Sequence, residues 1–226
     1  MFGYMKKTAF VAAVALATVP AAASALTTLS GTFNVTAVNA TGLFGSESQA
    51  TSGDLAAALA LGTSSSDAFT YVGALDFGTS DGTDATTIDG WLSTGPGTVS
   101  GLDSTFGGLQ LSAPNIGNGT ATTTFFSFVR QITGPVDEFV VTHDDGVGIY
   151  DDGVSLGGSV NPTSVRETTV TGFDGGEFQL IYVATNGDPS VLNVAAVPLP
   201  AGGLLLLTAL GGLGGAGALR RRRKAA

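Results

Sequence analysis

Hydrophobic and polar residues alternate with a period of two in several short stretches of the middle of the chain. Residues 31–38 (GTFNVTAV) place Phe, Val and Ala on one face and Thr or Asn on the other. The same alternation continues in four further stretches, at residues 69–77, 138–143, 166–173 and 177–185. A period of two is the signature of a β-strand with one face against a core.

The pattern of a helix is found in one stretch only, Asp54–Leu61 (DLAAALAL), with Asp54 as the expected cap. The rest of the middle is rich in Gly, Thr, Ser and Asp, which suits short strands joined by tight turns. We therefore expect an all-β protein in which residues 26–196 form a single antiparallel β-sandwich. The alternative is that Pro114–Gly119 links two smaller domains, but neither half is long enough for a secure sandwich.

The N-terminus has the layout of a secretory signal. Two lysines precede an apolar run, Thr8–Val19, that is too short to span a bilayer comfortably. Small residues then stand at Ala23 and Ala25, the −3 and −1 positions of an A-x-A cleavage site. Residues 1–25 are thus predicted to be a signal peptide that signal peptidase removes after Ala25, so that the remaining chain is exported.

The C-terminus has the layout of a membrane span with a basic end. Ala201–Leu219 carries no charge, and as a helix it would be ~28 Å long, close to the ~30 Å of bilayer hydrocarbon. Five cations follow immediately, Arg220, Arg221, Arg222, Arg223 and Lys224. Positive charge stays on the cytoplasmic side, so we expect a transmembrane helix with the domain outside the membrane.

The residues before this span carry a resemblance to a known family of signals. Residues 197–226 resemble the VPLPA-CTERM version of the PEP-CTERM sorting signal, which joins a proline-containing motif, a transmembrane helix and a basic cluster. The motif residues are Val197, Pro198, Leu199, Pro200 and Ala201. The resemblance implies cleavage nearby by an exosortase, a membrane-embedded peptidase of Gram-negative bacteria, and a link to exopolysaccharide and biofilm matrix. The alternative is a plain single-pass anchor whose prolines end a strand and start the helix.

Charge and composition exclude several classes of function. Seven of the nine Lys and Arg residues lie in the terminal segments, so the middle keeps only Arg130 and Arg166 against all 18 acidic residues. Such a surface repels nucleic acid and anionic lipid and attracts cations. The chain has no cysteine and one histidine, His143. Disulfides and thiolate chemistry are excluded, and a zinc site or a histidine-based triad has little scope.

The most distinctive internal stretch is residues 139–156, FVVTHDDGVGIYDDGVSL, with Asp-Asp-Gly at 144–146 and again at 151–153. Asp-Gly supplies the positive φ angles of tight hairpins, so the stretch predicts three strands joined by two turns. It resembles the lectin-like sandwich of anthrax protective antigen and many bacterial surface proteins. That resemblance implies that Asp144 and Asp145 hold a calcium ion that bridges to sugar hydroxyls. The sequence does not show the Asn and further loop ligands of such a site.

Two further observations bear on that calcium site. Successive turns of a meander lie at opposite ends of the strands, which argues against one cluster built from both Asp pairs. The sequence has neither the EF-hand spacing nor a Gly-Gly-x-Gly-x-Asp repeat. Ordinary turn chemistry therefore remains the alternative explanation of both Asp-Asp-Gly motifs.

Three functions remain. The first is a non-catalytic surface or matrix protein acting in adhesion, and the second a calcium-dependent carbohydrate-binding module with polysaccharide as its partner. A secreted glycosidase is the least favoured, because two carboxylates suffice for it but no catalytic motif is present. His143 is expected to be structural. Trp91, the only tryptophan, is expected in the core, the alternative being a platform for stacking a sugar.

Overall fold

The computed structural model describes residues 25–43, 45–79, 86–114 and 121–198. Residues Ser24–Leu199 form one compact unit. The predicted signal peptide up to Ser24 and the predicted span 201–219 with its basic cluster lie outside the described residues. Among the residues that are described, no helix combines the length and the apolar character needed to cross a membrane.

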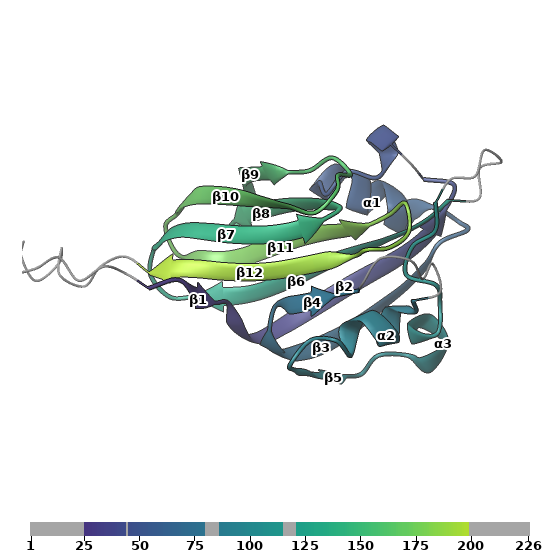
Figure 1. The fold of residues 1–226 in the computed structure, drawn as a ribbon, viewed down its shortest axis with the longest axis horizontal. Helices are drawn as coiled ribbons and strands as arrows, with labels where there is room; N and C mark the ends of the chain where they lie inside the picture. The colour runs from purple at the N-terminus through teal and green to yellow at the C-terminus, as the bar shows by residue number, and fades with distance from the viewer. Residues whose placement is uncertain (1–24, 44, 80–85, 115–120, 199–226) are drawn as a thin grey trace, which may run out of the picture. The chain divides into compact units, whose positions relative to one another are not determined.

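Twelve strands form two antiparallel sheets (Figure 1). The five-stranded sheet has the order β1-β12-β7-β10, with β4 also paired to β12. Its strands are β1 (Thr27–Thr28), β4 (Asp76–Gly78), β7 (Val136–Asp144), β10 (Arg166–Phe173) and β12 (Val191–Pro198). The seven-stranded sheet has the order β5-β3-β2-β6-β11-β8-β9. Its strands are β2 (Ser30–Thr41), β3 (Ser65–Ala74), β5 (Thr98–Ser100), β6 (Thr122–Ile132), β8 (Gly146–Asp151), β9 (Val154–Ser159) and β11 (Gly176–Ala184).

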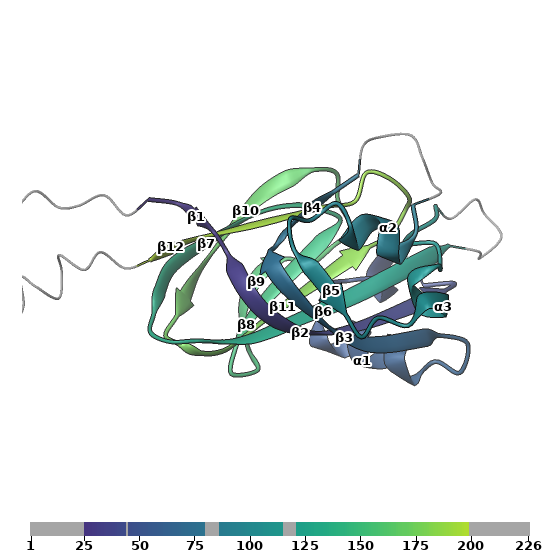
Figure 2. The ribbon, with the colours of Figure 1, turned by 90° about the horizontal axis from the view of Figure 1, so that it is seen from below.

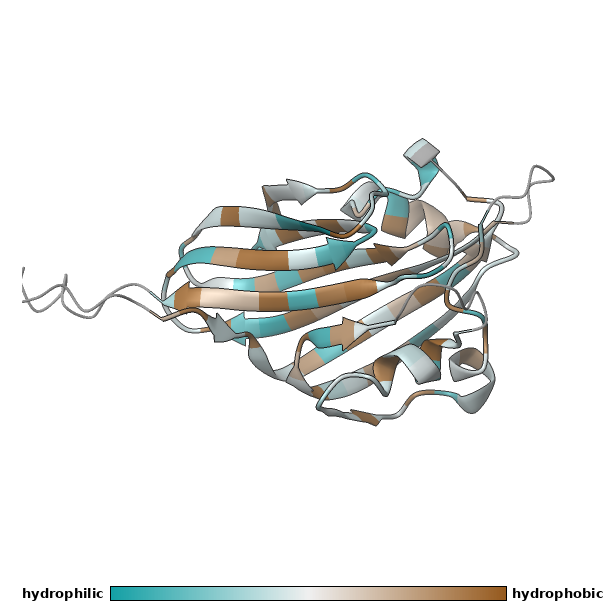
Figure 3. Cartoon of the chain, in the orientation of Figure 1, coloured by the Kyte–Doolittle hydropathy of each residue, from teal (hydrophilic) through white to brown (hydrophobic). Residues whose placement is uncertain are grey.

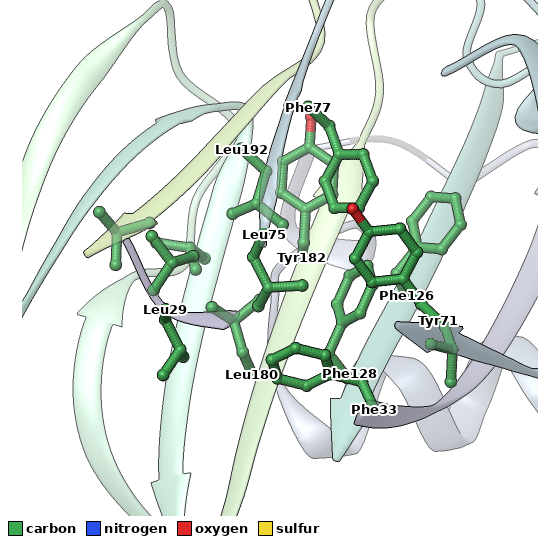
Figure 4. Packing of buried hydrophobic residues seen from close by; sticks show 14 of the residues in the cluster. Leu29, Phe33, Tyr71, Leu75, Phe77, Phe126, Phe128, Leu180, Tyr182 and Leu192 are labelled. Atoms are coloured by element: carbon green, nitrogen blue, oxygen red, sulfur yellow. The ribbon is translucent and has the colours of Figure 1, made fainter. Parts of the chain in front are cut away.

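The predicted all-β sandwich is confirmed, and so are the faces that the alternation indicated. On β2 the apolar residues Phe33, Val35 and Ala37 are at most 2% exposed and face the space between the sheets. Side chains from both sheets meet there in one main core (Figure 4). In Figure 3 the right-hand ends of β7 and β10 are hydrophilic, so polar residues gather where these two strands meet their loops.

Aromatic rings fill the centre of the core. Trp91 is completely buried, with its ring centroid 4.6 Å from Phe77, 4.8 Å from Phe126 and 5.2 Å from Tyr182. Burying large rings is among the strongest stabilising contributions that a small domain has. The expectation that Trp91 belongs to the core is confirmed, and the alternative of an exposed sugar-stacking platform is wrong.

A second, smaller core lies on the outer side of the seven-stranded sheet, under helix α1 (Ser52–Ala60) (Figure 2). Leu55 and Ala58 of the helix pack there with Val38, Phe125, Ile181 and Val183 from the sheet. This explains why β11 is apolar on both faces. A strand that is covered on both sides loses the polar half of its alternation.

The helices differ from the sequence expectation. Helix α1 begins at Ser52 and is capped by Thr51, whose side chain accepts a hydrogen bond from the backbone N–H of Asp54. Asp54 is therefore in the first turn and is not the cap. Two short helices were not expected, α2 (Ile88–Leu92) and α3 (Ser104–Gly107). Their Thr87 and Asp103 caps are N-cap residue types, but helices this short leave little periodic pattern.

The pairing of strand β12 shows at which end of the sandwich the described chain begins and ends. The strand starts at Val191 opposite Asp144 of β7 and ends at Pro198 opposite Val136, and Ala196 pairs with Thr27 of β1. The described chain therefore enters and leaves at one end of the sheet, on the left of Figure 1. The first Asp-Asp-Gly turn lies at the other end, about 25 Å away at the usual rise of a strand.

Candidate functional site

Asp144 and Asp145 form the turn between β7 and β8. Asp144 is the last residue of β7, and β8 begins at Gly146. Both carboxylate residues are buried, with 6% and 4% of their surface exposed, and the peptide bond between them is cis. Burying two adjacent acidic groups is costly unless hydrogen bonds or a cation compensate their charges.

The glycines that follow this Asp pair let other segments approach it. A Cβ on Gly146 would lie 2.3 Å from the carbonyl oxygen of Val160, and a Cβ on Gly148 would lie 2.4 Å from that of Ala50. The loop after β9 and the segment before α1 thus rest directly on β8, joined by a 2.8 Å hydrogen bond from the Ala50 N–H to the Val160 carbonyl. The DDGVG pattern is needed for this close approach.

Asp145 joins the turn to two loops. Its Oδ2 accepts a 2.7 Å hydrogen bond from the backbone N–H of Thr185, and the Thr163 backbone and the Asn186 side chain also hydrogen-bond to its carboxylate. Burial, together with the negative charge of Asp144, raises the pKa of Asp145 to about 8, although these hydrogen bonds act to lower it. The carboxylate therefore sits where additional positive charge would stabilise it.

His143 and Tyr182 hold the turn from beneath. His143 Nδ1 lies 2.5 Å from the Asp145 carbonyl oxygen, so Nδ1 carries the proton, and Nε2 accepts from Thr168 Oγ1 at 2.8 Å. Burial, and secondarily the charge of Arg166, lowers the pKa of His143 and favours the neutral ring. The buried Tyr182 hydroxyl donates to the Asp144 carbonyl. Both ring nitrogens of the completely buried His143 are thus hydrogen-bonded, which fits the structural role expected of this residue.

A pocket of about 330 Å³ opens beside the two carboxylates. Its walls come from the β7–β8 turn, the β9–β10 loop and the β11–β12 loop. The lining residues are Asp144, Asp145, Pro162, Thr163, Ser164, Thr185, Asn186, Gly187, Asp188 and Pro189. No aromatic residue is among them, so a ligand would be held through oxygen and nitrogen atoms and not by ring stacking.

The donor set fits a hard cation. The polar side chains that line the pocket are carboxylates, hydroxyls and one amide, and oxygen ligands of this kind are what calcium prefers. In the described part of the chain no group of three or more His, Cys, Asp or Glu is placed to hold a metal. A calcium ion at the Asp144–Asp145 pair would therefore need neutral oxygens as well, and Asn186, whose side chain hydrogen-bonds to Asp145, carries one.

Asn186 was missed at the level of sequence. It is 41 positions away from Asp145 along the chain, and the structure brings the two together through the β11–β12 loop. Its φ of +64° is a left-handed conformation that asparagine tolerates better than most residues. The signal that could have drawn attention to it is TNGDPS at 185–190, a dense run of turn-forming residues directly after an apolar strand.

The second Asp-Asp-Gly turn lies at the other end of β8, as the meander geometry predicted. Asp151 Oδ2 accepts from the backbone N–H of Asp174 at 2.9 Å, and Asp152 Oδ1 accepts from that of Glu177 at 2.8 Å. Asp152 is exposed. This pair serves as an acceptor for the β10–β11 turn and does not contribute to the pocket.

A second pocket, of about 390 Å³, lies over α2 and α3. Its lining includes Asp89, Thr87 and Ser104 together with several glycines. Asp89 is exposed and is the only acidic residue in that lining. Of these two pockets, the one at the Asp144–Asp145 turn therefore combines a cavity with buried carboxyl groups.

The sorting motif straddles the boundary of the described residues. Val197 and Pro198 belong to β12, where they pair with Glu138 and Val136, so the folded domain reaches two residues beyond the predicted limit of 196. The remaining motif residues Leu199, Pro200 and Ala201 lie outside the described part, as do Arg220, Arg221, Arg222, Arg223, Lys224 and Ala23. Ala25 is described and is exposed.

No family model matches the sequence, and no curated protein matches it. Among solved structures, the chain is similar to the PA14 sugar-binding domain of an RTX adhesin, at 14% identity and a TM-score of 0.48, covering 72% of this chain and 88% of that one. The PA14 domain of the antifreeze protein MpAFP follows at 17% identity and a TM-score of 0.45, covering 74% and 85%.

A GH31 alpha-xylosidase from Xanthomonas citri is also similar, at 12% identity and a TM-score of 0.36. The similarity covers 79% of this chain and 16% of the enzyme. Identities and TM-scores as low as these say nothing about function.

Proposed function

We propose that this domain is a calcium-dependent carbohydrate-binding module of an exported surface protein that acts in adhesion or in the exopolysaccharide matrix. The observation that carries the proposal is the pair of buried carboxylates, Asp144 and Asp145, in the wall of a polar pocket. A divalent cation would bridge the two carboxylates and remove the repulsion that arises when both are ionised.

The oxygen-rich lining supports calcium as the cation, with Asp144, Asp145 and Asn186 as the side chains that would hold it. Calcium accepts six to eight oxygen ligands, more than these side chains supply. Vicinal hydroxyl groups of a sugar are suitable ligands for the remaining positions. In this proposal the ion supplies the link between protein and sugar, and the loop residues around it orient the sugar.

The position of the pocket supports a role in display. The described chain enters at β1 and leaves at β12 at one end of the sandwich, and the pocket lies at the other. A tether at the terminal end would leave the pocket facing away from its attachment point. This arrangement suits a binding module carried on a membrane or a matrix.

Calorimetric titration of the full chain, purified in detergent, with calcium chloride tests the site. The unmodified protein is expected to bind calcium, and Asp145→Asn is expected to weaken binding by at least about 100-fold, because a coordinating charge is lost from a buried site. Asp152→Asn makes the same change in the second turn and is the matched control, with unchanged affinity.

A glycan array with calcium and with a chelator tests the ligand class. Sugar retention that needs calcium is the expected result. A protein that binds neither calcium nor any glycan would contradict the proposal and leave an adhesive domain without a small-molecule site. Hydrolysis of the bound glycan would instead identify a glycosidase.

We further propose that an exosortase recognises Val197, Pro198, Leu199, Pro200 and Ala201 and separates the domain from the predicted span 201–219. Mass spectrometry of the protein from its native cell tests this step. The expected mature protein starts at Leu26 and lacks Arg220–Lys224. A mature chain that still carries those five cations would indicate a permanent single-pass anchor.

A further inference from the structure

The segment 86–112, between β4 and β6, contacts the β11–β12 loop, Thr185–Ser190. Trp91, in α2, donates a 3.0 Å hydrogen bond from its indole N–H to the Ser190 carbonyl. Ser112, which follows α3, donates from its hydroxyl to the Gly187 carbonyl at 3.1 Å. Two well-separated points of this segment therefore hold the backbone of the loop that carries Asn186.

Thr79 makes the densest set of these contacts. Its hydroxyl donates to Asp188 Oδ1 at 2.9 Å and accepts from the backbone N–H of Ser190 at 2.8 Å. Its own backbone N–H donates to the Ser190 carbonyl at 3.1 Å. Thr79 directly follows β4, which pairs with the start of β12, so the anchor point is itself held by the sheet.

The side chain of Asp188 is the acceptor at the centre of this arrangement. Oδ1 accepts from Thr79, and Oδ2 accepts from the hydroxyl of Thr86 at 3.3 Å. Asp188 is only two positions after Asn186, so fixing Asp188 and Ser190 restricts where the Asn186 backbone can go. Asn186 itself tolerates its left-handed backbone, so its position follows from how its neighbours are held.

We propose that Thr79, Trp91 and Ser112 form a clamp that positions the β11–β12 loop for ligand binding, with Thr79 as its main positioning residue. The proposal rests on the calcium site proposed above. Thr79 would not touch the ion or the sugar. It would act through Asp188 and Ser190 by holding Asn186 beside Asp145. Supporting residues of this kind typically change metal affinity by about 10- to 100-fold when they are removed.

The decisive variant is Thr79→Val, which keeps the shape of the side chain and removes the hydroxyl. Calcium titration of the full chain should give an affinity at least about 10-fold weaker than that of the unmodified protein. Thr79→Ser keeps the hydroxyl and should restore near-normal affinity. If the loss of calcium affinity came only from a change in side-chain volume, Thr79→Ser would not restore binding.

Thr51→Val is the matched control. Thr51 is half-buried like Thr79, and its hydroxyl accepts the hydrogen bond from the Asp54 N–H that caps α1, outside the clamp. Its variant should lower the melting temperature, because a helix cap is lost, without weakening calcium binding. Equal affinities for Thr79→Val and the unmodified protein would overturn the clamp.

Hydrogen exchange without calcium gives a second, independent readout. Amides of Gly187 and Ser190 should exchange faster in Thr79→Val than in Thr51→Val. If the unmodified protein binds no calcium, the proposed function fails, but faster exchange at these amides still supports the clamp. Unchanged exchange in that case overturns the clamp as well.

Discussion

The two Asp-Asp-Gly turns have the same three residues, seven positions apart, yet their surroundings differ in almost every respect. In the first turn both acidic residues are buried beside a pocket, and burial raises the pKa of Asp145 to about 8. In the second turn Asp152 is exposed, and both carboxylates accept backbone N–H groups of one neighbouring turn. The chemistry of an Asp pair is therefore set by what packs around it.

What packs around the first turn arrives from far along the chain. Thr163 belongs to the β9–β10 loop, and Thr185 and Asn186 belong to the β11–β12 loop. Thr79 in turn supports the β11–β12 loop. The carboxylates of the second turn accept hydrogen bonds from the hairpin between β10 and β11. Convergence of several loops is what distinguishes a candidate binding site from a structural turn here.

The two glycines of the turns give the largest expected contrast. Gly146→Ala would place a Cβ 2.3 Å from the Val160 carbonyl, a backbone atom that cannot move aside alone. We expect a loss of about 3 kcal/mol in the free energy of unfolding. Gly153→Ala meets nothing within 4 Å and has only its φ of +78° to accommodate, so about 1 kcal/mol is expected.

Urea unfolding of the two glycine variants checks this contrast. Equal losses in both would mean that the β9–β10 loop does not rest on the first turn. The walls of the pocket would then be looser than the structure indicates.

Calcium should stabilise the protein through the first turn only. At a free calcium concentration 100 times the dissociation constant, binding adds about 2.7 kcal/mol to the free energy of unfolding. For a domain of this size that corresponds to a rise of about 5 to 10 °C in melting temperature. Asp144→Asn should abolish the rise and Asp151→Asn should preserve it, as measured by scanning calorimetry with calcium and with a chelator. A rise that survives in Asp144→Asn would place the ion elsewhere.

The sequence predicted the features that depend on neighbouring residues and missed those that depend on contacts between distant segments. The faces of β2 and of the first half of β11 follow from alternation, because burial between two sheets imposes a period of two on Phe33 and Val35 as on Phe178 and Leu180. The opposite placement of the two Asp pairs follows from the length of β8. Helices α2 and α3 span one turn or little more, which is too short for a pattern to emerge.

The loops that complete the site were beyond sequence reasoning for a different reason. Asn186 and Thr79 reach their positions through pairings of β12 with β7 and β4, which join residues 47 to 117 positions apart. The residues around Asn186 and those around Thr79 carry no pattern that indicates this pairing. Knowledge of the strand order is needed before TNGDPS can be placed beside the Asp pair.

Tyr182 gives an intermediate effect that is specific to the first turn. Its hydroxyl is fully buried and donates to the Asp144 carbonyl, whereas in the second turn the acceptors are bonded by backbone N–H groups. Tyr182→Phe removes the donor and leaves a buried carbonyl without it, at a cost of about 1 to 2 kcal/mol. Urea unfolding measures the loss, and a change below about 0.3 kcal/mol would show that water replaces the hydroxyl.

The smallest effect is expected at Asp152. Asn in this position keeps an oxygen that can accept from the Glu177 N–H, and it tolerates the φ of +46° that Asp152 adopts. We expect Asp152→Asn to change the free energy of unfolding by less than about 0.5 kcal/mol, a typical value for an exposed site.

Asp152→Val loses the acceptor and places a β-branched residue at positive φ, so a loss of about 2 kcal/mol is expected. Urea unfolding of the two variants separates geometry from charge, because only the second alters geometry. If Asp152→Asn were as harmful as Asp152→Val, the charge itself would matter in the second turn, and the two Asp pairs would be more alike than their burial indicates.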